Sequence, residues 1–259
     1  MIDNDKLKNF FNLLVVENRK IILPYFRKKI EVETKTDLSP VTIVDKLSEK
    51  KIRALILENF PEHGIQGEEF PNENLDSEYQ WIIDPIDGTR SFIVGRPTFG
   101  TLVGLYKQKE PLAGLIDMPV LEETWIGIKN NGSYFNGSKI KTKNTKQLSL
   151  STIACTSPNM FNKSEFGLYT KVEKKCKNSV WGGDCHNFAL LAGGYLEIVI
   201  ENNLSWHDIA ALVPVIEEAG GCICDWKGNK VHEKGKGDII ACNNEFTQKE
   251  VLKLMMRNE

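Results

Sequence analysis

The sequence predicts an α+β fold, and three observations support this. Helical periodicity dominates the N-terminal part, strand-like segments fill the middle, and strands alternate with helices toward the C-terminus. The chain has 259 residues, of which 41% are apolar and 26% are charged, so it can bury a sizeable core and is not mainly disordered. Elements of both kinds pack as layers around such a core.

Two amphipathic helices are predicted at the N-terminal end. Apolar residues recur at three- and four-residue steps from Leu7 to Tyr25, which is the pattern of a helix with one buried face. A polar, exposed stretch from Glu31 to Pro40 follows, and a second helix is expected over Asp45–Asn59. The residues of this second helix that we expect to be buried are Leu47, Ile52, Leu55 and Ile56.

The middle of the chain is typical of an antiparallel sheet. Strands are predicted at 80–84, 101–106, 112–118 and 124–128, and the first should end at Pro85 because proline cannot donate to a sheet. Asn130-Asn131-Gly132 is a hairpin turn signal. The lysine-rich segment Lys139–Ser149 favours a boundary between an α+β lobe, 1–145, and an α/β lobe, 146–259, within one domain.

The second lobe alternates strands and helices. Strands are predicted at 152–156 and 195–200, and helices at 166–175, 186–194 and 208–219. Gly220-Gly221 should close the last of these helices, and Pro214 should kink it. Thr247 and Glu250 form a capping-box pattern that predicts the start of a final helix.

Charge and cysteine content exclude several classes of protein. The net charge is −2, so no basic excess indicates nucleic acid or an anionic membrane as a partner. The six cysteines show neither a disulfide framework nor a C-x-x-C pair, and we expect reduced core residues. The acidic start and the lack of a long apolar run favour a soluble, cytoplasmic protein.

The most informative segment joins an apolar strand to two carboxylates. Trp81-Ile82-Ile83 leads into Asp84 and Asp87, and charges at the buried end of a strand are costly unless they are neutralised. Beyond Pro85 the two side chains can point into one site. Gly88 and Thr89 then offer backbone N–H groups for an anion.

Two further acidic positions have the same character. Glu68 follows a helix and a loop, and Asp208 opens a helix after a polar turn. Together with Asp84 and Asp87 they would form a cluster of oxygen ligands, which suits a hard cation such as Mg²⁺. The residues alone leave another interpretation open, in which Asp84-Pro85 is merely a turn and Asp208 merely an N-cap.

At these residues the sequence resembles the inositol monophosphatase superfamily. Its motif D-P-x-D-G-T-x-x-F stands here as Asp84–Phe92, and its W-D-x-A-A and E-A-G-G elements stand as Trp206–Ala211 and Glu218–Gly221. The G-E-E element is Gly67–Glu69. One departure is His207, inserted before Asp208, from which we expect little effect.

The resemblance implies a layered α-β-α-β-α sandwich, commonly a homodimer, that hydrolyses phosphomonoesters with two or three Mg²⁺. It implies that Glu68, Asp84 and the Ile86 carbonyl hold the first ion, and that Asp84, Asp87 and Asp208 hold the second. Gly88 and Thr89 would bind phosphate, and Glu68 and Thr89 would orient the attacking water. Asp45 would support Thr89 and a third, weaker metal. Inhibition by Li⁺ is expected on the same ground.

Substrate choice is predicted from residues outside these motifs. Glu201 and the segment Gly182-Gly183-Asp184 match substrate-facing positions, and with Arg90 they resemble the histidinol-phosphatase branch. Two acidic side chains suit a substrate that carries a cation, as L-histidinol phosphate does. Alternatives remain: Asp184 as a helix N-cap, Glu201 as a solvated strand end, and Arg90 as a surface or dimer-contact residue.

The leading hypothesis is therefore a Mg²⁺-dependent histidinol-phosphatase of histidine biosynthesis, acting on a small phosphomonoester. An inositol-1-monophosphatase or a broad-specificity phosphatase is the alternative. A non-catalytic metal-binding regulatory protein is disfavoured, because Glu68, Asp84, Asp87, Thr89 and Asp208 are all present.

Overall fold

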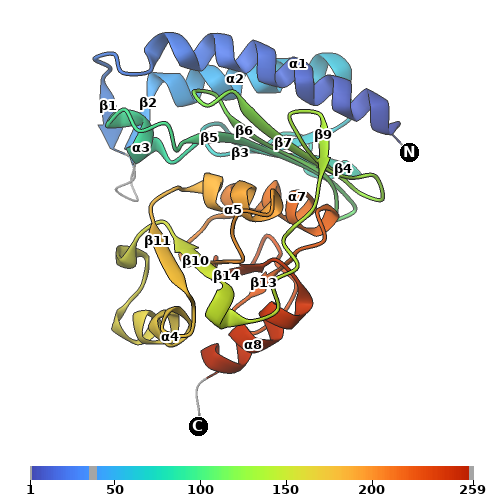
Figure 1. The fold of residues 1–259 in the computed structure, drawn as a ribbon. Coiled ribbons are helices and arrows are strands. Elements are labelled where there is room, and N and C mark those ends of the chain that lie inside the picture. Colours follow the sequence, from blue (N-terminus) through green and yellow to red (C-terminus); the bar gives the residue numbers. More distant parts are fainter. Residues whose placement is uncertain (1, 35–39, 257–259) are drawn as a thin grey trace.

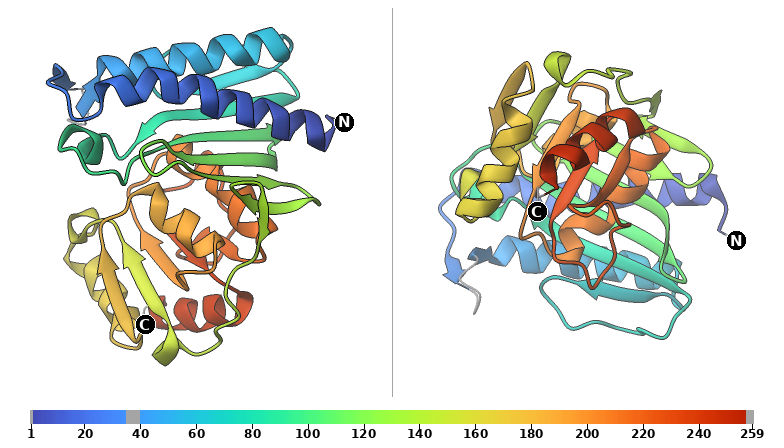
Figure 2. Two further views of the ribbon diagram at one scale, coloured as in Figure 1. Left: turned by 45° about the horizontal axis from the view of Figure 1, so that its top comes forward. Right: turned by 90° about the horizontal axis from the view of Figure 1, so that it is seen from below.

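The computed structural model describes residues 2–34 and 40–256, and five layers alternate between helices and sheets (Figures 1 and 2). Helices cover the outer face of one sheet, short helices lie between the two sheets, and further helices cover the outer face of the second sheet (Figure 1). In that order the helices are α1 (Asn4–Ile22), α2 (Ile43–Asn59), α5 (Cys185–Ala192), α6 (Trp206–Ala210), α7 (Leu212–Glu218), α4 (Lys163–Glu173) and α8 (Glu245–Met255). The expected α-β-α-β-α sandwich is confirmed.

The first sheet has seven strands in sequence order, and all neighbours are antiparallel except the first pair. Its strands are β3 (Gly64–Gly67), β4 (Tyr79–Asp87), β5 (Gly100–Lys107), β6 (Glu110–Met118), β7 (Glu123–Ile128), β8 (Gly132–Phe135) and β9 (Ser138–Ile140). The predicted antiparallel arrangement of the middle segments is confirmed, and the Asn130–Gly132 turn joins β7 to β8.

The second sheet has five strands in the order β11-β10-β12-β14-β13. These are β10 (Thr152–Cys155), β11 (Asn178–Trp181), β12 (Ile198–Glu201), β13 (Cys222–Asp225) and β14 (Ile239–Cys242). The sequence did not predict β11, β13 and β14. In β11 two polar residues precede two apolar ones, and all four are exposed. This strand therefore lacks the alternation of apolar and polar residues that predicts a half-buried strand.

Short elements complete the fold: β1 (Val32–Thr34), β2 (Pro40–Thr42), α3 (Thr89–Ile93) and the 3₁₀ turns η1 (Leu23–Tyr25), η2 (Leu148–Leu150) and η3 (Pro158–Met160). β1 and β2 pair within the stretch expected to be merely polar and exposed, and residues 35–39 of that stretch lie outside the described residues. The six cysteines are all free. None of the described helices has the length and apolar character that a bilayer crossing requires.

The prediction that Leu47 is buried is wrong. Leu47 is 36% exposed, whereas Ser48 and Glu49 are fully buried on the inner face of α2. Their polar atoms are satisfied there, because Ser48 donates to Asn18 Oδ1 and Glu49 accepts from Arg53 Nε. Polar residues with buried partners therefore occupy part of the face that apolar periodicity alone assigned to Leu47.

Two predicted helix starts are wrong, whereas the helix predicted to kink at Pro214 is indeed interrupted. The helix expected at 208–219 begins earlier, at Trp206, and is interrupted at Ala211, three residues before Pro214. This break fits the missing N–H and the ring of proline, which disturb the preceding turn. The expected capping box at Thr247 is wrong, because Asn244 caps α8 and its side chain accepts from Thr247 N.

The two predicted lobes share the middle layer. α6 and α7 belong to the second half of the chain, yet they pack against β5, β6 and β7 of the first sheet. The buried core between the sheets likewise combines Leu102 and Trp125 with Phe188 and Ile216. A lobe boundary within Lys139–Ser149 stays a prediction.

Candidate active site

The strand that carries the first motif does not end at Pro85, which corrects the prediction. β4 runs on to Asp87, but its register with β5 shifts between the pairs Asp84↔Leu102 and Asp87↔Gly100. Two residues of β4 thus stand opposite one residue of β5, as in a β-bulge. The Ile86 N–H donates to Asp84 Oδ1 at 3.0 Å within this bulge. The irregularity brings Asp84 and Asp87 to the same site.

The four predicted carboxylates do meet. One group of possible ligands comprises Glu68, Asp84 and His207, and another comprises Asp84, Asp87 and Asp208. In each group the ligand atoms all lie within 4.8 Å of one another, and Asp84 is common to both. We call Glu68, Asp84, Asp87 and Asp208 the carboxylate cluster. It joins the loop after β3, the β4 bulge and α6.

The electrostatics of the cluster fit a divalent cation. Burial raises the pKa of Asp84 well above its usual range, and repulsion by Glu68, Asp87 and Asp208 raises it further. Burial likewise raises the pKa of Asp87, with repulsion by Asp184 and Asp208. Gathering these charges costs free energy that a bound cation offsets. Closely spaced carboxylate oxygens are the donors that Mg²⁺ prefers.

Glu68 is positioned by a buried ion pair on α2. Glu49 accepts hydrogen bonds from the N–H groups of Glu69 (2.7 Å) and Phe70 (3.2 Å), and Arg53 donates to Glu49 at 2.7 Å. Gly67 is required for this approach, because a Cβ there would overlap Glu49 Oε1. The loop that carries Glu68 is therefore tied to the rigid helix α2.

Asp208 takes part in a helix cap and also lies in the cluster, so the two interpretations are compatible. It is the third residue of α6, and its Oδ2 accepts from the Ser205 N–H at 2.6 Å in a capping box. Its Oδ1 lies 3.7 Å from His207 Nε2. The cap fixes the side chain in a conformation that keeps one oxygen directed to the site.

Thr89, Gly88 and Asp45 lie together at the start of α3. Thr89 Oγ1 is 3.4 Å from Asp45 Oδ1 and donates to the Ile86 carbonyl at 3.0 Å. Gly88 has φ +78° and stands directly before the helix, a conformation that favours glycine. Asp45 is buried, which raises its pKa, while hydrogen bonds from Thr42 counteract the rise.

A cavity of about 60 Å³ joins the carboxylate cluster to the two acidic residues predicted to select the substrate. Asp87, Asp208, Asp184 and Glu201 all line this cavity, which we call the acidic pocket. Residues far apart in the chain thus line one cavity. Asp87 and Asp208 of the carboxylate cluster and the further carboxyl groups of Asp184 and Glu201 all face it.

Asp184 occupies the N-cap position before α5, but its side chain does not act as the cap. Its side chain makes no capping hydrogen bond; Asp184 Oδ2 accepts from Ser91 Oγ at 2.7 Å. The Cys185 N–H at this helix start donates to Asp87 Oδ2 at 2.7 Å instead. Burial raises the pKa of Asp184, whereas the Ser91 hydrogen bond and the positive charges of Arg96 and Arg90 lower it.

The backbone around Asp184 is unusual. Gly182, Gly183 and Asp184 have φ values of +92°, +126° and +48°, so three consecutive residues occupy the region that L side chains avoid. Asp184 N donates to Thr156 Oγ1 at 3.0 Å, which holds the turn. A non-glycine residue in this conformation is typical of a site where geometry matters for function.

Glu201 is buried at the end of β12, so it is not a solvated strand end. Its Oε1 accepts from the Thr156 N–H at 3.0 Å and from Thr156 Oγ1 at 2.7 Å. Burial, only partly offset by the Thr156 hydrogen bond, raises the pKa of Glu201 to about 8. Arg90, by contrast, is exposed.

Comparison with known proteins agrees with this geometry. A profile of the inositol monophosphatase family matches residues 3–258. The chain belongs to the inositol monophosphatase family. It is a phosphoric monoester hydrolase, as the relatives of this family are.

The chain is similar to the bifunctional phosphatase IMPL2 of Arabidopsis thaliana, with 42% identity over 92% of this chain and 69% of that protein. It is 35% identical to a histidinol-phosphatase of Chlorobaculum parvum, over 87% of each chain. A solved inositol monophosphatase of Zymomonas mobilis superposes with a TM-score of 0.88 and 36% identity, over 98% of this chain and 99% of that one. Relatives with different substrates in their names thus share the fold.

In this family member, three side chains at the site had no predicted role. Ser91 and Thr156 hold Asp184 and Glu201. His207, from which we expected little effect, lies with its Nε2 3.9 Å from Glu68 Oε1. The sequence position of His207 next to Asp208 could have indicated that His207 lies near the carboxylate cluster. Only the fold shows that these two consecutive residues of α6 both reach it.

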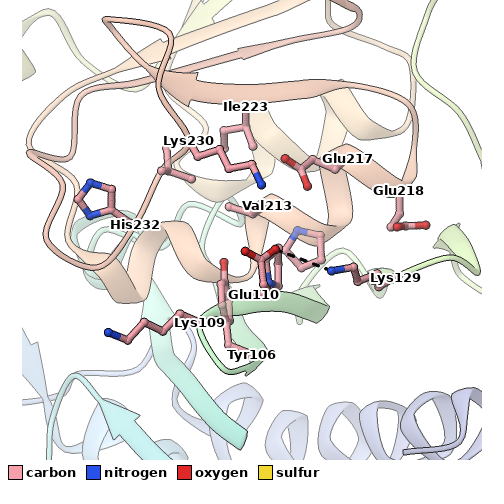
Figure 3. Close-up of a pocket in the computed structure, with 13 residues that line it drawn as sticks. Tyr106, Lys109, Glu110, Lys129, Val213, Glu217, Glu218, Ile223, Lys230 and His232 are labelled. Carbon is pink, nitrogen blue, oxygen red and sulfur yellow. Dashed lines mark ion pairs between the residues drawn. The ribbon is translucent and has the colours of Figure 1, made fainter. Parts of the chain in front are cut away.

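A larger cavity of about 380 Å³ lies elsewhere, against α7 (Figure 3). Tyr106, Glu110 and Lys129 line it from the first sheet, with Lys230 and His232 on the opposite side. The carboxylate groups with ligand spacing among the described residues include none of its residues. This cavity is larger than the acidic pocket, but the two groups of closely spaced metal-ligand side chains lie at the acidic pocket and the adjoining carboxylate cluster.

Proposed function

We propose that this protein is a Mg²⁺-dependent histidinol-phosphatase, which hydrolyses L-histidinol phosphate to L-histidinol and phosphate in histidine biosynthesis. The observation that carries the proposal is the acidic pocket, which places Asp184 and Glu201 on the same cavity as Asp87 and Asp208. A phosphate at the carboxylate cluster would leave the other end of the substrate facing two acidic groups. L-Histidinol phosphate carries an ammonium and an imidazole at that end.

The donor set supports two Mg²⁺ ions that share Asp84. Glu68, Asp84 and the Ile86 carbonyl would hold one, and Asp84, Asp87 and Asp208 the other. When bound, Mg²⁺ supplies positive charge that offsets the phosphate dianion and the developing charge of the leaving oxygen. The family resemblance also predicts a third, more weakly bound metal ion near Asp45.

The residues of the chain itself bind and orient. The N–H groups of Gly88 and Thr89 would donate to phosphate oxygens at the start of α3. Glu68 and Thr89 would orient the attacking water. Asp45 Oδ1, 3.4 Å from Thr89 Oγ1, would accept the Thr89 hydrogen bond in place of the Ile86 carbonyl, which accepts it at 3.0 Å in the structure and would hold the ion. Asp87 would have two partners: the Mg²⁺ ion that it shares with Asp84 and Asp208, and the Cys185 N–H, from which its Oδ2 already accepts a hydrogen bond.

The alternative is an inositol-1-monophosphatase or a broad-specificity phosphatase, and the name of the Zymomonas relative favours it. The buried pair Asp184 and Glu201 argues against it. A cation beside these two carboxyl groups would lower their raised pKa values and pair with the charge that forms, whereas a neutral polyol supplies no such charge. A homodimer and inhibition by Li⁺ stay predictions from the family resemblance.

Replacement of Asp184 by Asn tests the proposed substrate. Asn keeps the shape and an acceptor for Ser91 but removes the charge. We expect kcat/KM for histidinol phosphate to fall about 30- to 150-fold, or about 2–3 kcal/mol, and kcat/KM for glycerol phosphate to change less than about threefold. Asp76→Asn, a change at an exposed aspartate outside the site, is the matched control.

The ratio of the two losses decides the test. Equal losses for both substrates would mean that Asp184 is structural, and no loss for either would mean that the cation binds elsewhere. Both results contradict the histidinol-phosphatase proposal and leave the inositol or broad-specificity alternative.

A further inference from the structure

His207 brings nitrogen to a site otherwise made of oxygen. Among the described residues, the two groups that could hold a metal ion contain one histidine, and it stands with Glu68 and Asp84. Its Nε2 lies 3.9 Å from Glu68 Oε1 and 3.7 Å from Asp208 Oδ1. The proposed function assigns it no role.

These distances fit ligands of one ion better than hydrogen bonds. Donor–acceptor distances in protein hydrogen bonds are about 2.7–3.2 Å, so 3.7 and 3.9 Å are too long for direct contact. Two ligands at about 2.1 Å from a common metal lie up to about 4.2 Å apart. The His207 side chain is 26% exposed, so its ring is not enclosed in the core and can turn toward an ion.

The two halves of the centre differ in donor chemistry. Glu68, Asp84 and His207 offer two oxygens and one imidazole nitrogen, whereas Asp84, Asp87 and Asp208 offer oxygen only. Imidazole suits Zn²⁺ and other first-row transition ions, while carboxylate oxygen suits Mg²⁺. One shared residue, Asp84, would thus connect two sites of unequal preference.

We propose that His207 is a ligand of the ion held by Glu68 and Asp84, and that this half of the centre, which also takes Mg²⁺ in the proposed function, binds a transition-metal ion such as Zn²⁺ more tightly. The inference rests on the metal roles given to Glu68 and Asp84 in the proposed function. The half formed by Asp84, Asp87 and Asp208 retains the preference for Mg²⁺. The centre can then hold Zn²⁺ in one half and Mg²⁺ in the other, as well as the two Mg²⁺ ions of the proposed function.

Binding measurements on the metal-free protein test the selectivity. Zn²⁺ and Mg²⁺ are titrated separately into wild type, His207→Ala and the control His232→Ala by calorimetry. We expect His207→Ala to weaken the tighter Zn²⁺ event about 10- to 100-fold and to change Mg²⁺ binding less than about threefold. His232 is exposed and outside both ligand groups, so its replacement should change neither.

A spectroscopic readout separates a ligand from a neighbour. The chain has four histidines, so protein labelled with ¹⁵N-histidine gives a simple set of imidazole signals. Addition of Zn²⁺ should shift one ring nitrogen strongly, and this signal should be missing in His207→Ala. Mg²⁺ should cause no such shift. An unshifted His207 nitrogen in the Zn²⁺-loaded protein would overturn the inference, even if the affinity fell.

Glu68→Gln distinguishes this failure from failure of the proposed metal site. If Glu68→Gln loses Zn²⁺ binding while His207→Ala keeps it, His207 is no ligand and only the present inference is wrong. If Glu68→Gln binds Zn²⁺ as the wild type does, the metal role of Glu68 fails, and the inference fails with it.

Discussion

At the scale of single residues, Glu201 couples the acidic pocket to the stability of the fold. Its pKa is raised to about 8 by burial, so the folded chain keeps a proton that the unfolded chain releases near pH 4.5. The folded state then binds more protons between these values, and stability falls as pH rises through that window. The protonated carboxyl still accepts hydrogen bonds from Thr156.

We therefore predict that Glu201→Gln removes a pH-dependent loss of stability. Relative to this variant, the wild type should lose up to about 4 kcal/mol of unfolding free energy between pH 5 and pH 9. Denaturant unfolding in EDTA at several pH values measures the difference. Glu62→Gln, at an exposed position, should follow the wild type. Parallel pH profiles for wild type and Glu201→Gln would contradict the raised pKa.

At the scale of elements, a row of glycines lets α6 and α7 lie directly on the first sheet. Gly104, Gly114 and Gly127 are register partners on β5, β6 and β7. A Cβ at Gly104 would come within 3.0 Å of the Ala210 backbone, and one at Gly114 would overlap Ala211 O. Because α6 carries Asp208, this close packing also sets the position of a proposed metal ligand.

Gly114→Ala should consequently push the α6–α7 region away from the sheet. We expect a destabilisation of about 1–3 kcal/mol, measured by thermal or denaturant unfolding, and weaker Mg²⁺ binding. Gly167→Ala in α4 is the control, because nothing lies within 4 Å of the added Cβ and alanine favours the helix. If Gly114→Ala were as stable as Gly167→Ala, the glycine row would not be needed for packing.

At the scale of the whole molecule, metal binding should stabilise the five-layer fold. The carboxylate cluster joins elements from both halves of the chain, so a bound ion ties them together. Mg²⁺ at one hundred times its Kd should add about 2.7 kcal/mol to the unfolding free energy. Thermal melts in EDTA and in saturating Mg²⁺ should therefore differ by several degrees.

Asp84→Asn is the sharpest comparison for this prediction. It removes the shared carboxylate and also the repulsion that raises the pKa of Asp84. The variant should melt above the wild type in EDTA but gain little from Mg²⁺. Equal gains from Mg²⁺ in wild type and variant would mean that the ion binds elsewhere.

The sequence alone determined the features that depend on near neighbours. Apolar periodicity predicted α1, α2 and β5–β7, because each of these elements buries one face or most of its length. The segment from Asp84 to Thr89 contains the β4 bulge and the start of α3, so its carboxylates could be grouped before the fold was known. The residues alone offered the approach of Glu68 and Asp208 to that segment as one of two interpretations, and the family resemblance favoured it.

Only the tertiary structure decided which distant side chains meet. Ser91 contacts Asp184 across 93 residues of sequence, and Asp87 binds the Cys185 N–H across 98. The position of His207 beside Glu68 depends on how closely α6 packs over the glycine row. Such contacts arise from the packing of whole layers, in which burial and backbone hydrogen bonding choose the partners, and sequence spacing carries no signal for them.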